Sequence, residues 1–189
     1  MDSRRRLWIL SGSFGGLLFT INFFLGASLS YLTGNPGFSG LVTGFTTAFV
    51  FYVLLRLTRT FGAMSIAFTL YCLLAIPTVL MGPPGPYKVI VGLSSGLAFD
   101  IVLWILRYRL WSFLVGFVVY VLTMLAGMYV CYMYFDFPGL ETLRGVMFIL
   151  AVIFAVEGCL GGSIAHMLFE RRLRRLTVVK RVSMVPLEE

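Results

Sequence analysis

Charged residues are scarce in this sequence: Asp, Glu, Lys and Arg together make up 12% of the 189 residues, whereas 59% are hydrophobic. A soluble domain of this size needs many more polar residues to cover its surface. A lipid bilayer removes that need, because lipid replaces the polar exterior and each helix satisfies its own backbone hydrogen bonds. The composition excludes an ordinary soluble domain and predicts an integral membrane protein.

Residues that build metal sites and disulfides are also few. The 3 cysteines lie within apolar runs and lack the spacing of metal ligands or of a disulfide framework, and there is 1 histidine. We therefore predict no metal and no cofactor, and we interpret Cys72, Cys131 and Cys159 as small buried hydrophobic residues. Neither a phosphate-binding loop nor a catalytic triad is recognisable, so an enzyme is not expected.

The net charge of +7 follows a clear pattern along the chain. All of the 15 Lys and Arg except Lys88 and Arg144 lie on alternate connections between apolar runs, including both ends of the chain. Under the positive-inside rule, this pattern indicates an even number of spans with both termini in the cytoplasm. We interpret the basic residues as topology signals of a plasma-membrane protein, with no nucleic-acid partner.

Apolar runs separated by short connections predict the fold class: an all-α integral membrane protein with a six-transmembrane-helix bundle. The first run is too long for a signal-peptide core, so we interpret it as a retained span. Residues 1–170 are expected to form one transmembrane domain and residues 171–189 a basic cytoplasmic tail. The expected spans are 8–32, 38–57, 61–81, 87–106, 110–135 and 143–169.

Two acidic residues lie inside predicted spans, where an unpaired charge is costly. Asp100 precedes Arg107 by two helical turns, so a structural pairing with an arginine is one interpretation and contact with a ligand is the other. Glu157 lies near the middle of its span and is predicted either to contact a ligand or a proton or to form a structural hydrogen bond. His166 is expected at the inner interface of the membrane.

Small residues recur at intervals of four, which places both members of a pair on one helix face and allows close helix packing. Internal packing is one interpretation, and contact of the first helix with a foreign helix is the other. The pairs are Ser11 with Gly15, Gly12 with Gly16, Gly92 with Gly96, and Gly158 with Gly162.

Aromatic residues gather in the outer half of the fifth span, around Tyr129 and Tyr132. They fit either an interfacial aromatic belt or a stacking pocket for a flat heterocycle, closed by the loop that contains Asn35 and by the proline loop 82–86. Lys88 follows the proline loop directly and is a candidate to meet an anionic group.

The proline loop and the helix after it carry a family resemblance. The stretch Met81-Gly82-Pro83-Pro84-Gly85-Pro86, continuing through Ser95 and Asp100 to Arg107, resembles the YkoE-type S components of energy-coupling-factor (ECF) transporters, which are linked to thiamine or its hydroxymethylpyrimidine precursor. The resemblance implies a subunit that captures a vitamin from outside the cell. The candidate substrate-binding residues are then Asn35, Lys88, Ser95, Tyr129, Tyr132 and Glu157.

The same resemblance implies partners: a transmembrane coupling subunit and two ATPase subunits, to which the first helix presents Ser11, Gly12, Gly15 and Gly16. The alanine pair usual in the family is missing at this place. A metal substrate is disfavoured, because the histidine pattern of cobalt and nickel S components is absent. A structural or assembly subunit of a larger membrane complex remains the alternative, whereas an enzyme using Asp100 and Glu157 is least favoured.

Overall fold

The computed structural model describes residues 3–33, 40–136 and 140–184, which contain helices and no strand. It confirms the all-α prediction, with six helices of 13 or more residues followed by two short elements at the end of the described chain. The elements are α1 (Ser3–Thr33), α2 (Gly40–Thr58), α3 (Ala63–Ala75), α4 (Tyr87–Ile105), α5 (Leu110–Tyr134), α6 (Leu140–Arg171), η2 (Leu173–Arg175) and α7 (Thr177–Val182).

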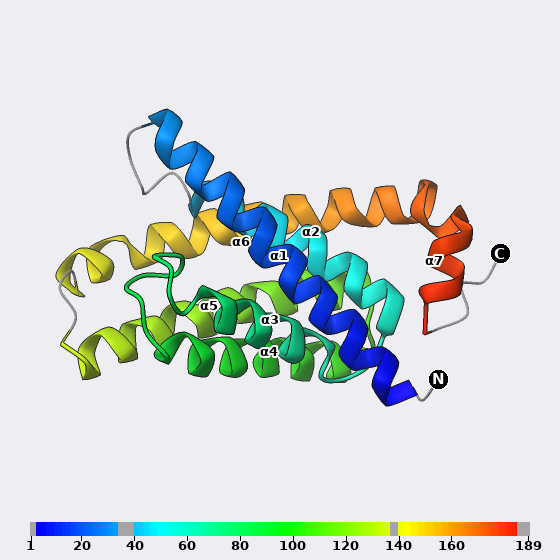
Figure 1. Cartoon of the computed structure of the whole chain (residues 1–189), viewed down its shortest axis with the longest axis horizontal. Helices are drawn as coiled ribbons and strands as arrows, with labels where there is room; N and C mark the ends of the chain where they lie inside the picture. The colour runs from blue at the N-terminus through cyan, green and yellow to red at the C-terminus, as the bar shows by residue number, and fades with distance from the viewer. Residues whose placement is uncertain (1–2, 34–39, 137–139, 185–189) are drawn as a thin grey trace.

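The six long helices pack in a ring, in the order α1, α3, α4, α5, α6 and α2, with α2 returning to α1 (Figure 1). Aromatic side chains from four of them fill the centre. The ring of Phe51 on α2 contacts Phe68 on α3, Phe99 on α4 and Tyr120 on α5, with centroids 5.7–6.0 Å apart. Aromatic pairs at such distances add to the packing of a core.

Within the described residues, four stretches are long and apolar enough to cross a membrane: Arg4–Gly26, Tyr87–Ile105, Leu110–Tyr134 and Arg144–Arg175. The apolar stretches Thr43–Thr58 of α2 and Ala63–Ala75 of α3 are shorter. The third span was predicted to run to residue 81, and this is wrong, because α3 ends at Ala75. Pro77 explains the early end, since it has no N–H to donate and its ring disfavours helix in the preceding residue.

Two of the predicted small-residue pairs hold neighbouring helices close together. A Cβ atom at Gly92 would lie 2.6 Å from the Cys72 sulfur, so α4 approaches α3 closely there; Gly96 likewise lies against the Ser65 backbone. Gly158 and Gly162 receive phenylalanine rings of α5. These pairs serve internal packing, as in one of the two interpretations from the sequence.

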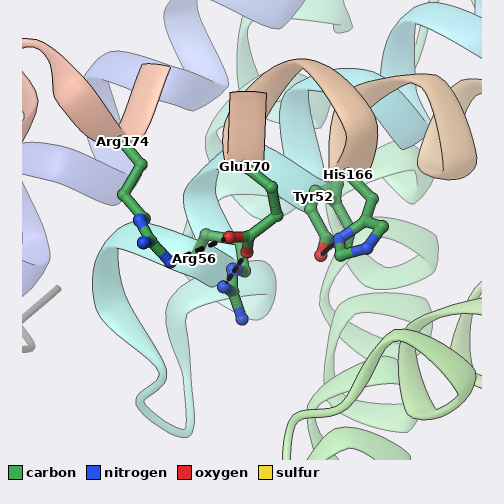
Figure 2. Close-up of polar contacts among 5 residues, drawn as sticks. All are labelled: Tyr52, Arg56, His166, Glu170 and Arg174. Atoms are coloured by element: carbon green, nitrogen blue, oxygen red, sulfur yellow. Dashed lines mark hydrogen bonds and ion pairs between the residues drawn. The ribbon is translucent and has the colours of Figure 1, made fainter. Parts of the chain in front are cut away.

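The arginine-rich ends of the helices lie together. The start of α1, the end of α6 and α7 are at the same end of the bundle (Figure 1). Glu170 on α6 pairs with Arg56 on α2 and, at 3.2 Å, with Arg174 in η2 (Figure 2). The chain then folds back, and the Met184 N–H donates to the Leu57 carbonyl at the end of α2 (2.8 Å).

His166 also contributes to this basic end. Its Nδ1 lies 2.7 Å from the Tyr52 hydroxyl of α2 (Figure 2). The Arg56 guanidinium lies 5.5 Å from the centroid of the Phe169 ring, one turn further along α6. Helices α2 and α6 are therefore fastened by polar contacts where the sequence placed the inner surface of the membrane.

Candidate binding cavity

A cavity of about 320 Å³ lies at the end of the bundle opposite the arginines. Its walls come from the first half of α2, from α3, from the segment after α3, from the middle of α5 and from α6. Aromatic rings and methionine side chains are prominent among the lining residues, as is common in small-molecule sites. The lining residues are Thr43, Gly44, Thr47, Phe68, Tyr71, Val79, Leu80, Met81, Gly82, Phe117, Tyr120, Val121, Met124, Leu125, Met128, Leu150 and Phe154.

Four of the lining rings form a continuous aromatic floor. Phe68 stacks on Tyr71 with centroids 5.4 Å apart and an interplanar angle of 10°. Tyr120 meets Phe68 at 4.8 Å and Phe117 at 5.3 Å. These residues are almost completely buried and belong to the central aromatic core, so the floor is rigid and preformed.

Few polar groups reach the cavity. The hydroxyl of Tyr71 is buried and makes no hydrogen bond of good geometry among the described residues. The Asn22 side chain on α1 lies near this hydroxyl as a donor, and it also donates to Thr47 (3.5 Å) and accepts from Thr46 (2.5 Å) on α2. Thr43 and Thr47 add two further hydroxyl groups to the wall.

Glu157 lies directly behind the cavity wall. Its carboxylate packs against the backbone of Gly44, which itself lines the cavity, and a Cβ atom at residue 44 would collide with Oε2. Oε2 is buried and has no hydrogen-bond partner in the described part of the chain. A buried acid within an apolar helix is often a functional position.

The segment after α3 covers the cavity and is fastened to α4. The Tyr87 hydroxyl lies 2.9 Å from the Pro83 carbonyl and 3.1 Å from the Met81 carbonyl. Gly82, with φ of 95°, sits between the hydroxyls of Tyr87 and Tyr132, and a Cβ atom there would lie 2.6 Å from the latter. Residues 76–86 therefore form a defined cover, which we call the roof segment.

Lys88 anchors the base of this roof segment. Its buried ammonium donates to the carbonyls of Ala75 (3.0 Å) and Thr78 (2.6 Å). In this structure the ammonium of Lys88 is held by backbone carbonyls, not by an anionic group. These carbonyls lie at and just after the end of α3, where a positive charge is favourable.

Asp100 binds the opposite end of α3. Its carboxylate accepts from the Ser65 N–H (2.9 Å), the Ser65 hydroxyl (2.5 Å) and the Met64 N–H (3.3 Å). The predicted pairing with an arginine is wrong, because α3 begins beside Asp100 and offers its unpaired N–H groups instead. The carboxylate thus has a structural role away from the cavity.

The remaining predicted substrate residues do not meet at the cavity. Asn35 lies outside the described residues. The Ser95 hydroxyl donates to the Val91 carbonyl within α4. Tyr129 and Tyr132 are half-buried near the C-terminal end of α5, beyond the lining residues.

The small residues of α1 divide between two surfaces. Ser11 is fully buried, and a Cβ atom at Gly15 would collide with the Ala67 carbonyl of α3. Gly12 lies at ordinary contact distance from Leu70, whereas a Cβ at Gly16 would meet nothing within 4 Å. Ser11 and Gly15 are thus used for packing inside the chain, and Gly16 faces outward.

The cavity tyrosines Tyr71 and Tyr120 were not identified from the sequence. A signal was present, because each is a polar aromatic residue in the middle of an apolar run. Buried tyrosines usually need a partner for the hydroxyl, so such positions merit attention. The dense aromatic cluster further along α5 drew attention to Tyr129 and Tyr132 instead.

One comparison with known proteins bears on the fold. A solved structure described as "Crystal structure of an S-component of ECF transporter" matches with a TM-score of 0.53 and 18% sequence identity, covering 96% of this chain and 92% of that chain. No protein-family model and no curated protein matches the chain. The likeness shows that this chain has the fold of that S component.

Proposed function

We propose that this protein is a membrane-embedded substrate-capture subunit of the ECF type. The observation that carries the proposal is an aromatic-lined cavity inside a bundle with the fold of an S component. A preformed apolar cavity with few polar groups is the usual form of a small-molecule site. In this proposal, partner subunits supply the energy for uptake, since no nucleotide-binding motif is recognisable in the sequence.

The proposed orientation follows from charge. With the arginine-rich end in the cytoplasm, all six helices cross the plasma membrane and the cavity lies toward the outside. The roof segment then separates the cavity from the external solution. A substrate enters from that side, and transport requires a coupling subunit and two ATPase subunits.

The proposed substrate is a flat heterocyclic vitamin, with thiamine or its hydroxymethylpyrimidine precursor as the first choice. The stacked rings of Phe68 and Tyr71, with Tyr120 across them, offer faces for a planar ring. A cationic ring gains further from aromatic faces. Glu157, which packs against Gly44 behind the cavity wall, adds an acidic group next to the cavity.

The test is ligand binding to the purified full-length chain in detergent. We expect native mass spectrometry to detect thiamine or the pyrimidine, and titration to give an affinity well below millimolar. Met124→Trp fills the cavity and should abolish binding. Leu122 on the same helix is 52% exposed, so Leu122→Trp should leave binding unchanged. Failure of every heterocyclic vitamin to bind would contradict the proposal.

A further inference from the structure

We propose that the cavity accepts only ligands without negative charge and that Tyr71 selects among them by donating a hydrogen bond to an acceptor atom on the ligand. This inference rests on the proposed function and narrows its substrate class. It makes Tyr71 a specificity-determining residue. The substrate is then an uncharged or cationic heterocycle, and the phosphorylated or carboxylated forms of vitamins are excluded.

Tyr71 has the properties of a recognition group. The residue is 1% exposed, it lines the cavity, and its hydroxyl is left without a hydrogen bond in the described part of the chain. Burying a hydroxyl without a partner costs free energy. The stacked Phe68 ring holds the phenol in place. A ligand atom that accepts a hydrogen bond from the Tyr71 hydroxyl therefore recovers the free energy lost when the hydroxyl is buried, without a rearrangement of the site.

No basic residue lines the cavity within the described chain. Lys88 is committed to the carbonyls of Ala75 and Thr78, and its ammonium is buried beneath the roof segment. Arg144 is exposed on α6, almost two turns before Leu150, and is not part of the wall. Residues 34–39 and 137–139, which the structure does not describe, include no Lys or Arg.

An acidic side chain beside the cavity also disfavours an anionic ligand. The Glu157 carboxyl borders the cavity through Gly44 and has one oxygen without a partner. An anion entering the cavity would lose its hydration, gain no counter-charge and meet an acid. A neutral or cationic ring avoids these costs.

The decisive experiment compares matched ligand pairs on the unmodified full-length chain. The probes are thiamine and thiamine monophosphate, riboflavin and its phosphate, pyridoxine and its phosphate, and nicotinamide and nicotinate, each measured by equilibrium dialysis. For whichever pair binds, we expect the anionic member to bind at least about 100-fold more weakly, since it gains no counter-charge in the site. Equal or tighter binding of the anionic member overturns the inference while leaving the proposed function intact.

Tyr71 is tested by Tyr71→Phe, with Tyr134→Phe as the control because Tyr134 is 81% exposed at the end of α5. Loss of one hydrogen bond should lower the affinity for the probe that binds by about tenfold. A second measurement compares the affinities for hydroxymethylpyrimidine and for its benzene analogue, in which CH replaces each ring nitrogen. A purely structural role of Tyr71 would not change the ratio of these two affinities. The wild-type chain should prefer the pyrimidine, and Tyr71→Phe should reduce that preference.

The outcomes separate the two proposals. Unchanged affinity and unchanged preference in a folded Tyr71→Phe variant overturn the role of Tyr71. Should that variant fail to fold, equal binding of the pyrimidine and its benzene analogue to the wild-type chain overturns it instead. Absence of binding by every probe in the panel overturns the proposed function, and the inference falls with it.

Discussion

Lys88 and Asp100, both on α4, bind opposite ends of the same short helix. Lys88 donates to carbonyls at the end of α3, and Asp100 accepts from N–H groups at its start. The two residues are 12 positions apart, which corresponds to about 18 Å along a helix, close to the ~20 Å length of the 13-residue α3. Each charge also has the sign that the helix dipole favours at its end.

This arrangement explains how a helix shorter than a bilayer is tolerated within the bundle. A helix of 13 residues is about 20 Å long, shorter than the ~30 Å hydrocarbon core of a bilayer, and unpaired backbone groups within hydrocarbon are costly. The charged side chains of α4 satisfy several of those groups, and the backbone groups in turn satisfy the charges. Each of these two charged residues alone carries a high free-energy cost inside a membrane, and the hydrogen bonds to α3 offset that cost for both.

Replacing Asp100 should destabilise the protein without an effect specific to the ligand. We expect Asp100→Ala to lower the free energy of unfolding by about 1–3 kcal/mol, because buried N–H groups lose their acceptor. Asp100→Asn should cost less, since an amide oxygen still accepts. Thermal unfolding in detergent measures both, with Asp136→Asn at an exposed position as the control. Equal stability of wild type and Asp100→Ala would contradict the capping role.

Replacing Lys88 should loosen the roof segment. Lys88→Met keeps the aliphatic stem but removes the ammonium donor that joins the carbonyls of Ala75 and Thr78; the Ala75 carbonyl still accepts from the N–H and the hydroxyl of Thr78. We expect a loss of about 1–3 kcal/mol in stability and faster hydrogen exchange in residues 76–82 than elsewhere. Arg144→Met, at an exposed position, is the control. Unchanged exchange in the roof segment would show that Lys88 does not anchor it.

The sequence predicted much of the fold, because long apolar runs and basic connections reflect the lipid solvent directly. It predicted five helices closely and missed the early end of α3, although Pro77 was visible. The ends of α3 also determine the roles of Lys88 and Asp100, so a wrong boundary gave wrong partners for both. Identifying Asp100 as a cap requires knowing that Ser65 lies beside it, and no local pattern records that contact.

The site was predicted less well for a related reason. A cavity is the space left between side chains from four helices and the roof segment, so its lining depends on helix rotation. The aromatic cluster around Tyr132 is prominent in the sequence, yet the cavity uses Tyr71 and Tyr120. Glu157 was identified from the sequence because an acidic residue inside an apolar span is unusual whichever way the helix is rotated about its axis.

At the basic end, Glu170 should matter more than its exposed partner. Glu170→Gln breaks the contact with Arg56 between α2 and α6, and it weakens the pair with Arg174 (Figure 2). We expect about 1–2 kcal/mol of destabilisation, because a partly buried arginine loses its charge partner. Arg174→Ala removes only the i,i+4 pair and should cost about 0.5 kcal/mol or less. Equal effects of the two variants in thermal unfolding would contradict this ranking.

Two adjacent glycines of α1 should behave differently, although the sequence does not distinguish them. Gly15→Ala places a methyl group against the Ala67 carbonyl of α3, so the helices must separate, and we expect a clear fall in the unfolding temperature. Gly16→Ala meets nothing within 4 Å, and it should be neutral or slightly stabilising because alanine favours helix.

The outward position of Gly16 also allows a test of partner contact. Gly16→Trp should leave folding and ligand binding of the isolated chain unchanged, because the side chain projects away from the bundle. If a coupling subunit packs on this face, the bulky ring prevents close helix approach. We then expect loss of co-purification with the coupling subunit and ATPases on co-expression, while Leu122→Trp, exposed on α5, retains it. Retention of the complex by Gly16→Trp would place the partner on another face.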